Sequence, residues 1–117
     1  MKVRTSELTG PALDYAVAKC ERRPYSVILD EIKGALPLLA PIFSPSTSWQ
    51  EGGPIIEREY MSLHDTTSVP NRWIATCHPA ENRRCVEYGP TLLVAAMRCY
   101  VSKCLGHEVD VPEEICN

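Results

Sequence analysis

The segment Leu92–Leu105, LLVAAMRCYVSKCL, predicts the longest helix of the chain and decides how the other elements must be arranged. It follows Gly89-Pro90-Thr91, a typical helix start, and precedes Gly106, which can end a helix with a positive φ. Its polar residues are only Arg98, Ser102 and Lys103. A helix that is apolar on almost every face is either enclosed between other elements or forms a self-association surface. We favour enclosure, with a homo-oligomer as the alternative.

A second, amphipathic helix is predicted between Thr9 and about Cys20. Thr9 can cap it, and a proline such as Pro11 is favoured in a first helical turn. Spacings of i, i+3, i+4 and i+7 place one apolar stripe on its surface, made of Leu13, Ala16, Val17 and Cys20. Asp14 is expected to lie off this stripe.

Short strands are predicted around these helices. Alternating residues in Met61–His64 and Arg72–Cys77, on either side of a turn at Ser68–Asn71, indicate a β-hairpin. The inward face of its second strand would carry Trp73, Ala75 and Cys77. Further strand signals are Lys2–Thr5, Tyr25–Leu29, Cys85–Tyr88 and Val109–Val111, whereas Pro79–Arg84 resembles a polar turn and Lys33–Phe43 a loop or irregular edge strand. We expect an α+β fold, a small mainly antiparallel sheet covered by helices, in a single compact domain over residues 1–117.

The composition argues against several classes of function. A net charge of −3 gives no general attraction to nucleic acid or anionic lipid, so nucleic-acid binding is not expected. The apolar run from Gly34 to Phe43 is interrupted by Pro37 and Pro41, and it is shorter than the roughly 20 residues of a membrane-spanning helix. The first residues carry no apolar secretory signal, which predicts a cytoplasmic protein without a membrane association.

The six cysteines do not form a recognisable metal-binding or catalytic motif. In a reducing cytoplasm they are expected to be buried residues or free thiols rather than disulfides. Cys77-His78 with Cys85, and Cys99 with Cys104, lack the paired spacing of a zinc site, so neither a metal nor a cofactor is expected. Cys77 should face the core and His78 the opposite side of the strand, which also argues against Cys-His catalysis.

The segment Ser44–Glu59, SPSTSWQEGGPIIERE, combines cap-forming residues with a break at Gly52-Gly53-Pro54. Its serines and threonine can cap a short helical turn, after which a new helix begins at Pro54. A single interrupted helix is equally consistent with the spacing. In both cases Trp49 and Ile56 are predicted to face inward.

Two Gly-Pro pairs, Gly53-Pro54 and Gly89-Pro90, predict helix N-termini whose free N–H groups could hold a phosphate. Trp49 could stack on a base, and threonine or arginine side chains could contact the anion. The candidate ligand-binding residues are Trp49, Gly52, Gly53, Arg58, Thr91 and Arg98. The alternative is that each Gly-Pro pair only begins a helix and that Trp49 belongs to the core.

Three stretches together resemble one family of phage proteins. They are LTGPALDYAVAKCE (residues 8–21), SPSTSWQEGGPIIERE (44–59) and GPTLLVAAMRCYVSKCLGHEVDVPEEI (89–115). In this order they resemble the NinX family of small proteins from P22-like bacteriophages and, more loosely, phage proteins described as an α-β-α sandwich. The resemblance implies a phage or prophage gene of the accessory early region, with no established activity and no catalytic residues to carry over.

The favoured function is therefore a non-enzymatic phage accessory protein in the cytoplasm of the infected bacterium. It would bind a host or phage protein, and countering a host defence is one form of that role. The first alternative is a protein that sequesters a nucleotide at its helix N-termini, and the second is a small hydrolase or transferase. A pocket at Trp49, Gly53 and Thr91 lined by Arg58 or Arg98 would favour sequestration, whereas a flat apolar patch near the last helix would favour protein binding.

Overall fold

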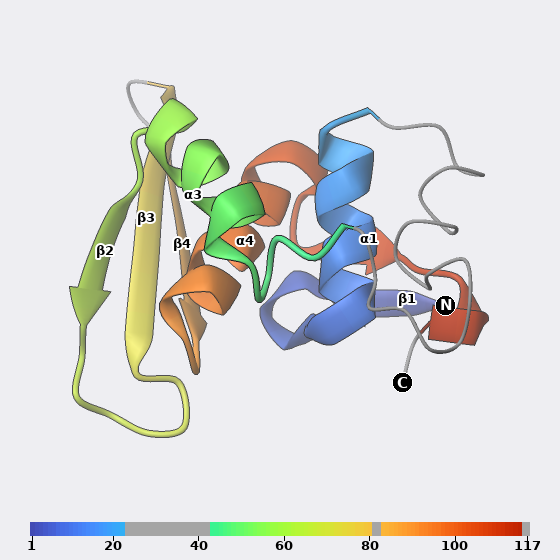
Figure 1. The fold of residues 1–117 in the computed structure, drawn as a ribbon, viewed down its shortest axis with the longest axis horizontal. Helices are drawn as coiled ribbons and strands as arrows, with labels where there is room; N and C mark the ends of the chain where they lie inside the picture. The colour runs from blue at the N-terminus through green and yellow to red at the C-terminus, as the bar shows by residue number, and fades with distance from the viewer. Residues whose placement is uncertain (23–42, 81–82, 116–117) are drawn as a thin grey trace.

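The computed structural model of the chain describes residues 1–22, 43–80 and 83–115 (Figure 1). Its helices are α1 (Gly10–Cys20), α3 (Trp49–Arg58) and α4 (Leu92–Leu105), and its strands are β1 (Lys2–Arg4), β2 (Ser62–Asp65), β3 (Trp73–Ala80), β4 (Arg83–Gly89) and β5 (Glu108–Asp110). Single 3-10 turns occupy Thr5–Glu7 and Glu113–Ile115. All the strand pairings are antiparallel: β2, β3 and β4 form one sheet in that order, and β1 pairs with β5 in a second. The α+β prediction is confirmed, although the strands form two sheets.

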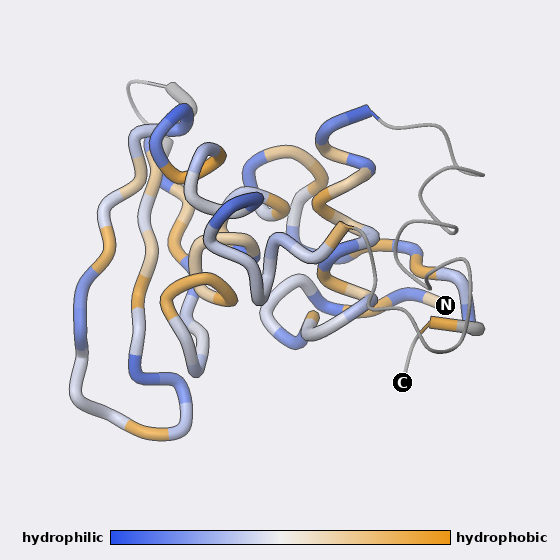
Figure 2. Tube along the Cα trace, in the orientation of Figure 1, coloured by the Kyte–Doolittle hydropathy of each residue, from blue (hydrophilic) through white to orange (hydrophobic). Residues whose placement is uncertain are grey.

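Helix α4 lies between the three-stranded sheet and α1, with α3 packed beside it (Figure 1). Every residue from Leu93 to Ser102 is buried. Figure 2 shows apolar residues along α1 and on the first turn of α4, and hydrophilic residues where α1 and α3 end. The predicted enclosure of α4 is confirmed, because this fold gives every apolar face of the helix a neighbour. Gly106 follows α4 with a φ of 88°, as expected for a glycine that ends a helix.

Helix α1 begins after Thr9 and ends at Cys20, as predicted. Residues Ala12 to Ala18 are all buried, and this run includes Asp14. The apolar stripe is therefore wider than predicted, and Asp14 lies inside the protein because the loop before α3 covers it.

The predicted hairpin is confirmed, with Leu63 paired to Ala75 across β2 and β3. On β3, Trp73 is half-buried and Ala75 and Cys77 are buried, so these residues do share the inward face. The expected turn at Pro79–Arg84 is shorter than predicted, because β3 continues to Ala80 and β4 begins at Arg83. The predicted strand at Tyr25–Leu29 lies outside the described residues, as does Lys33–Phe43 except for Phe43, which is buried.

The segment Ser44–Glu59 contains one helix, α3 (Trp49–Arg58), with Pro54 inside it. A helix start at Gly53-Pro54 is therefore wrong, and the single-helix alternative is correct. Trp49 is the first residue of α3 and is 53% exposed, so the prediction that it faces inward is also wrong. The buried positions of α3 are Gly52 and Ile55, while Ile56 packs partly against the core as predicted.

Gly52 allows α3 to approach its neighbours closely. A Cβ atom at this position would lie 2.6 Å from the Cδ2 atom of Leu93 and 2.6 Å from the carbonyl oxygen of Pro45. A Cβ atom at Gly53 would meet nothing nearer than a Trp49 ring carbon at 3.9 Å. The first glycine is therefore required by packing, and the second is not.

We expect Gly52→Ala to lower the free energy of unfolding by about 2 kcal/mol or more, because the new methyl group overlaps a backbone oxygen that cannot move aside alone. Gly53→Ala is the matched control. It should stay within about 1 kcal/mol of the parent, because the gain in helix propensity offsets the crowding of a Cβ atom before Pro54. Urea unfolding of both variants measures the difference, and equal destabilisation would contradict the packing role.

Candidate functional site

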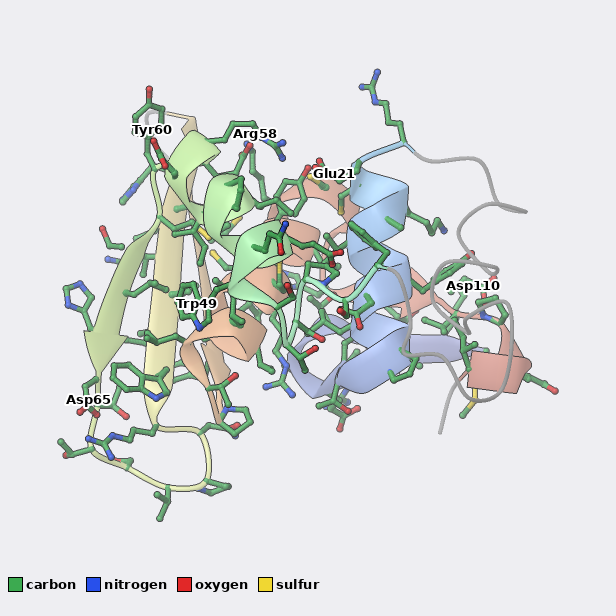
Figure 3. All side chains as sticks on the ribbon, in the orientation of Figure 1. Glu21, Trp49, Arg58, Tyr60, Asp65 and Asp110 are labelled. Atoms are coloured by element: carbon green, nitrogen blue, oxygen red, sulfur yellow. The ribbon has the colours of Figure 1, made fainter. Side chains whose placement is uncertain are left out.

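A groove of about 440 Å³ lies where α3, β3 and α4 begin. The loop before α3 and the first residues of these three elements line it: Ser46, Thr47, Trp49, Trp73, Pro90, Thr91, Leu92, Leu93 and Val94. Both tryptophans of the chain are among them. Figure 3 shows Trp49 at the first turn of α3, and about half of its side chain is exposed. The groove is therefore mainly apolar, with hydroxyl groups at its edges.

Local contacts position Thr91 and Trp73 in the groove. The Thr91 hydroxyl oxygen accepts a hydrogen bond from the Val94 N–H at 3.1 Å, which caps α4. The Trp73 ring lies 5.5 Å from the guanidinium of Arg72, and the Arg72 Nε atom donates to the Asp65 carboxylate at 2.7 Å. Asp65 also pairs with Trp73 across β2 and β3, so contacts within the hairpin stabilise the position of Trp73 in the groove.

Two carboxylates position the loop before α3. The Ser46 N–H donates to the Asp14 carboxylate at 2.9 Å, and the Ser44 N–H donates to the Glu51 carboxylate. Burial raises the pKa of Asp14 to about 6, although the hydrogen bonds from Ser46 act in the opposite direction. Helix α1 thus fixes one wall of the groove through a buried acid.

The structure brings together only two of the predicted ligand-binding residues. Trp49 and Thr91 both line the groove, whereas Gly52 is buried behind it and Gly53, Arg58 and Arg98 do not line it. Arg98 is 5% exposed, and its guanidinium donates to the carbonyl oxygens of Leu8 at 2.8 Å and Tyr88 at 2.7 Å. The pocket therefore has the predicted aromatic residue and threonine but neither predicted arginine.

Arg58 belongs to a polar network at the opposite end of α3. Its Nη2 atom lies 2.9 Å from the Glu21 carboxylate and 3.0 Å from the Tyr100 hydroxyl, and its Nε atom lies 3.0 Å from the Glu59 carboxylate. Lys103 forms an ion pair with the same Glu59. Figure 3 shows Arg58 and Glu21 at the facing ends of α3 and α1. These contacts hold the three helices together, which gives Arg58 a structural role.

Residues 4–103 match the family described as Bacteriophage P22, NinX. The chain belongs to this family. The match includes every described residue that lines the groove, all of α1 and α3, and α4 as far as Lys103. It covers the first two of the three stretches completely and the third as far as Lys103, which confirms the family resemblance. Among curated proteins, none is similar enough in sequence to count as a match.

Three of the cysteines that the structure describes in this NinX protein lie together in the core. Cys77, Cys85 and Cys99 are buried between α4 and the three-stranded sheet, where the Cys77 and Cys99 sulfur atoms are 3.4 Å apart. His78 is exposed, which confirms that it points away from Cys77. Within residues 1–22, 43–80 and 83–115, no group of three or more His, Cys, Asp or Glu side chains could hold a metal ion. None of the helices described there is long and apolar enough to cross a bilayer.

The sequence did not indicate that Trp73 would share a groove with Trp49. The only sequence feature that concerns Trp73 is its position at the start of a predicted strand, as the first of the alternate residues that face inward. The same holds for Leu92 at the start of α4. A residue at the start of a strand or helix often lies at the edge of the core. Which of these residues come together depends on how the elements pack, and the sequence of one segment does not show this.

Asp14→Asn should make the free energy of unfolding of this NinX protein less sensitive to pH. The pKa of Asp14 in the folded state, about 6, lies above the ordinary value of 3.8 for an aspartate, so the folded state binds the proton more tightly. The contribution of Asp14 to the free energy of unfolding is therefore greatest below pH 3.8, and it is lost as the pH rises through 6. Between pH 5 and 7.5 the variant should gain about 1 kcal/mol relative to the parent. Denaturant unfolding at both pH values tests this, and a constant difference would contradict it.

Proposed function

We propose that this NinX-family protein acts without catalysis, as a phage accessory protein that binds a host or phage protein through the Trp49–Trp73 groove. The supporting observation is the lining of the groove, in which the nine residues that the structure describes include two tryptophans and no charged side chain. Tryptophan is the residue type that most often supplies binding energy at protein interfaces. The proposed site of action is the cytoplasm of the infected bacterium, and interference with a host defence protein is one form of the role.

The charges around the groove favour a protein over a nucleotide. A nucleotide phosphate needs cations or free N–H groups, and Arg58 and Arg98 are committed to internal contacts. At the start of α4 the Val94 N–H is already bonded to Thr91, and Arg72, next to the Trp73 ring, is paired with Asp65. An apolar side chain of a partner requires none of these groups, because its transfer from water into the groove is favourable by itself.

The residue types in the groove also support a non-catalytic role. Among the described residues of the chain, those that line it supply hydroxyl groups from Ser46, Thr47 and Thr91 but no His, Cys, Asp, Glu or Lys. A hydroxyl nucleophile needs an adjacent base, and none lines this groove. Binding is therefore the chemistry that these residues suit.

Trp49→Ala should weaken binding to the partner by about tenfold or more, because an exposed tryptophan at the centre of an interface commonly contributes over 1 kcal/mol. Tyr60→Ala is the matched control, since Tyr60 is 89% exposed and lies beyond the far end of α3 (Figure 3). The tagged protein is isolated from infected cells, the co-purifying protein is identified, and the purified partner is titrated against all three forms. Tryptophan fluorescence reports occupancy directly, because both tryptophans line the groove.

Each alternative has its own result in the same preparation. A nucleotide released on denaturation, with no stoichiometric protein partner, would overturn the proposal in favour of sequestration. Equal loss of binding in Trp49→Ala and Tyr60→Ala would exclude the groove as the binding site. Light scattering that shows only a stable oligomer, dissociated by Trp49→Ala, would identify the occupant as a second copy of the chain.

A further inference from the structure

A second feature of the surface lies at the opposite end of the helices from the groove. Cys20 is the last residue of α1, and Cys104 lies in the last turn of α4. Both side chains line a surface cavity of about 370 Å³, and Cys104 is near enough to Cys20 to raise the pKa of the Cys20 thiol. Cys20 is half-buried and Cys104 is exposed. Two thiols are thus neighbours in a cavity that small molecules can reach.

The three other cysteines of the described ranges differ in access. Cys77, Cys85 and Cys99 are at most 6% exposed and lie within the apolar core. A reagent in solution must open the packing between α4 and the sheet to reach them. Selective chemistry at Cys20 and Cys104 is therefore expected from burial alone.

The cavity around the pair is basic. Its lining consists of Lys19, Cys20, Arg22, Lys103, Cys104 and Leu105. Lysine and arginine side chains attract small anionic thiol compounds, which in cells usually carry carboxylates. Lys103 is also paired with Glu59, so Lys19 and Arg22 are the stronger attractors.

We propose that Cys20 and Cys104 are a redox-active thiol pair, oxidised to an intramolecular disulfide by an anionic low-molecular-weight disulfide such as glutathione disulfide. The modification joins the C-terminal ends of α1 and α4. It is independent of the groove and of the function proposed above.

The reaction proceeds by two thiol–disulfide exchanges. The Cys104 sulfur, as thiolate, attacks one sulfur of glutathione disulfide, which forms a mixed disulfide and releases one glutathione as a thiolate that takes up a proton. The Cys20 sulfur then loses its proton and attacks the Cys104 sulfur, which releases the second glutathione. The two protein thiols lose two electrons and two protons in total, and one glutathione disulfide becomes two glutathione molecules.

The order of attack follows from exposure and acidity. Cys104 is the exposed thiol, so it meets the reagent first. Burial raises the pKa of Cys20, and the neighbouring Cys104 raises it further, which keeps the Cys20 thiol protonated until the mixed disulfide has formed. Cys20 is thereby the resolving thiol, held next to the sulfur that it must attack.

The test exposes the folded full-length chain to buffers of increasing glutathione disulfide and maps the disulfides by mass spectrometry of its peptides. The parent should form a Cys20–Cys104 bond and retain no glutathione. Cys20→Ser should stop at one glutathione on Cys104, and Cys104→Ser should react at least tenfold more slowly at Cys20 than the parent reacts at Cys104. Oxidation should raise the thermal midpoint of the parent by about 5 °C or more, because the new bond constrains the unfolded chain.

The inference is overturned if the parent accumulates stable glutathionylated Cys104, or if its first disulfide is Cys77–Cys99 or involves Cys116. Serine is close in size to cysteine, and the circular dichroism of both variants shows whether they fold. If either variant unfolds, peptide mapping and the thermal midpoint of the parent before and after oxidation decide the question alone.

Discussion

Helix α4 is apolar on almost all of its faces, and covering those faces is the constraint on which the rest of the structure depends. The three-stranded sheet covers one side, α1 covers another, and α3 packs beside them. Each of these elements is too short to be stable alone, because a three-turn helix or a small sheet gains little without a packed apolar face. The order of the layers therefore follows from the need to surround one helix.

Enclosing α4 also brings polar groups inside, and their partners show how the packing is kept specific. Arg98 extends from α4 to two backbone carbonyls, one in the loop before α1 and one on β4. Glu87 and Ser102 are buried in its vicinity, and burial raises the pKa of Glu87. A buried cation without such acceptors would cost several kcal/mol. The arginine thus fixes the position of α4 relative to both neighbours, and this is why it contributes nothing to the groove.

Elements with a strong local pattern could be predicted from the sequence. The limits of α1 and α4, the hairpin and the inward faces of Ala75 and Cys77 depend on periodicity and caps within one segment, and the structure agrees with them. The candidate site depended on contacts between segments, and there prediction was less successful. The spacing between Trp49 and Ile56 predicts that both residues face inward, yet α3 makes its close approach to its neighbours through Gly52. Arg58 and Arg98 were assigned to a ligand because nothing local shows that Glu21 and the Leu8 carbonyl would bind them.

The pairing of β1 with β5 has a consequence for the order of folding. Val3 lies opposite Val109, so two strands that are over a hundred residues apart in the chain must meet. During synthesis the first strand leaves the ribosome long before its partner exists, while α1 can form from local contacts at once. The helices and the hairpin can therefore assemble around α4 first. The small terminal sheet then closes the molecule as its last, most non-local step, and until that moment β1 has a free edge that could pair with another chain.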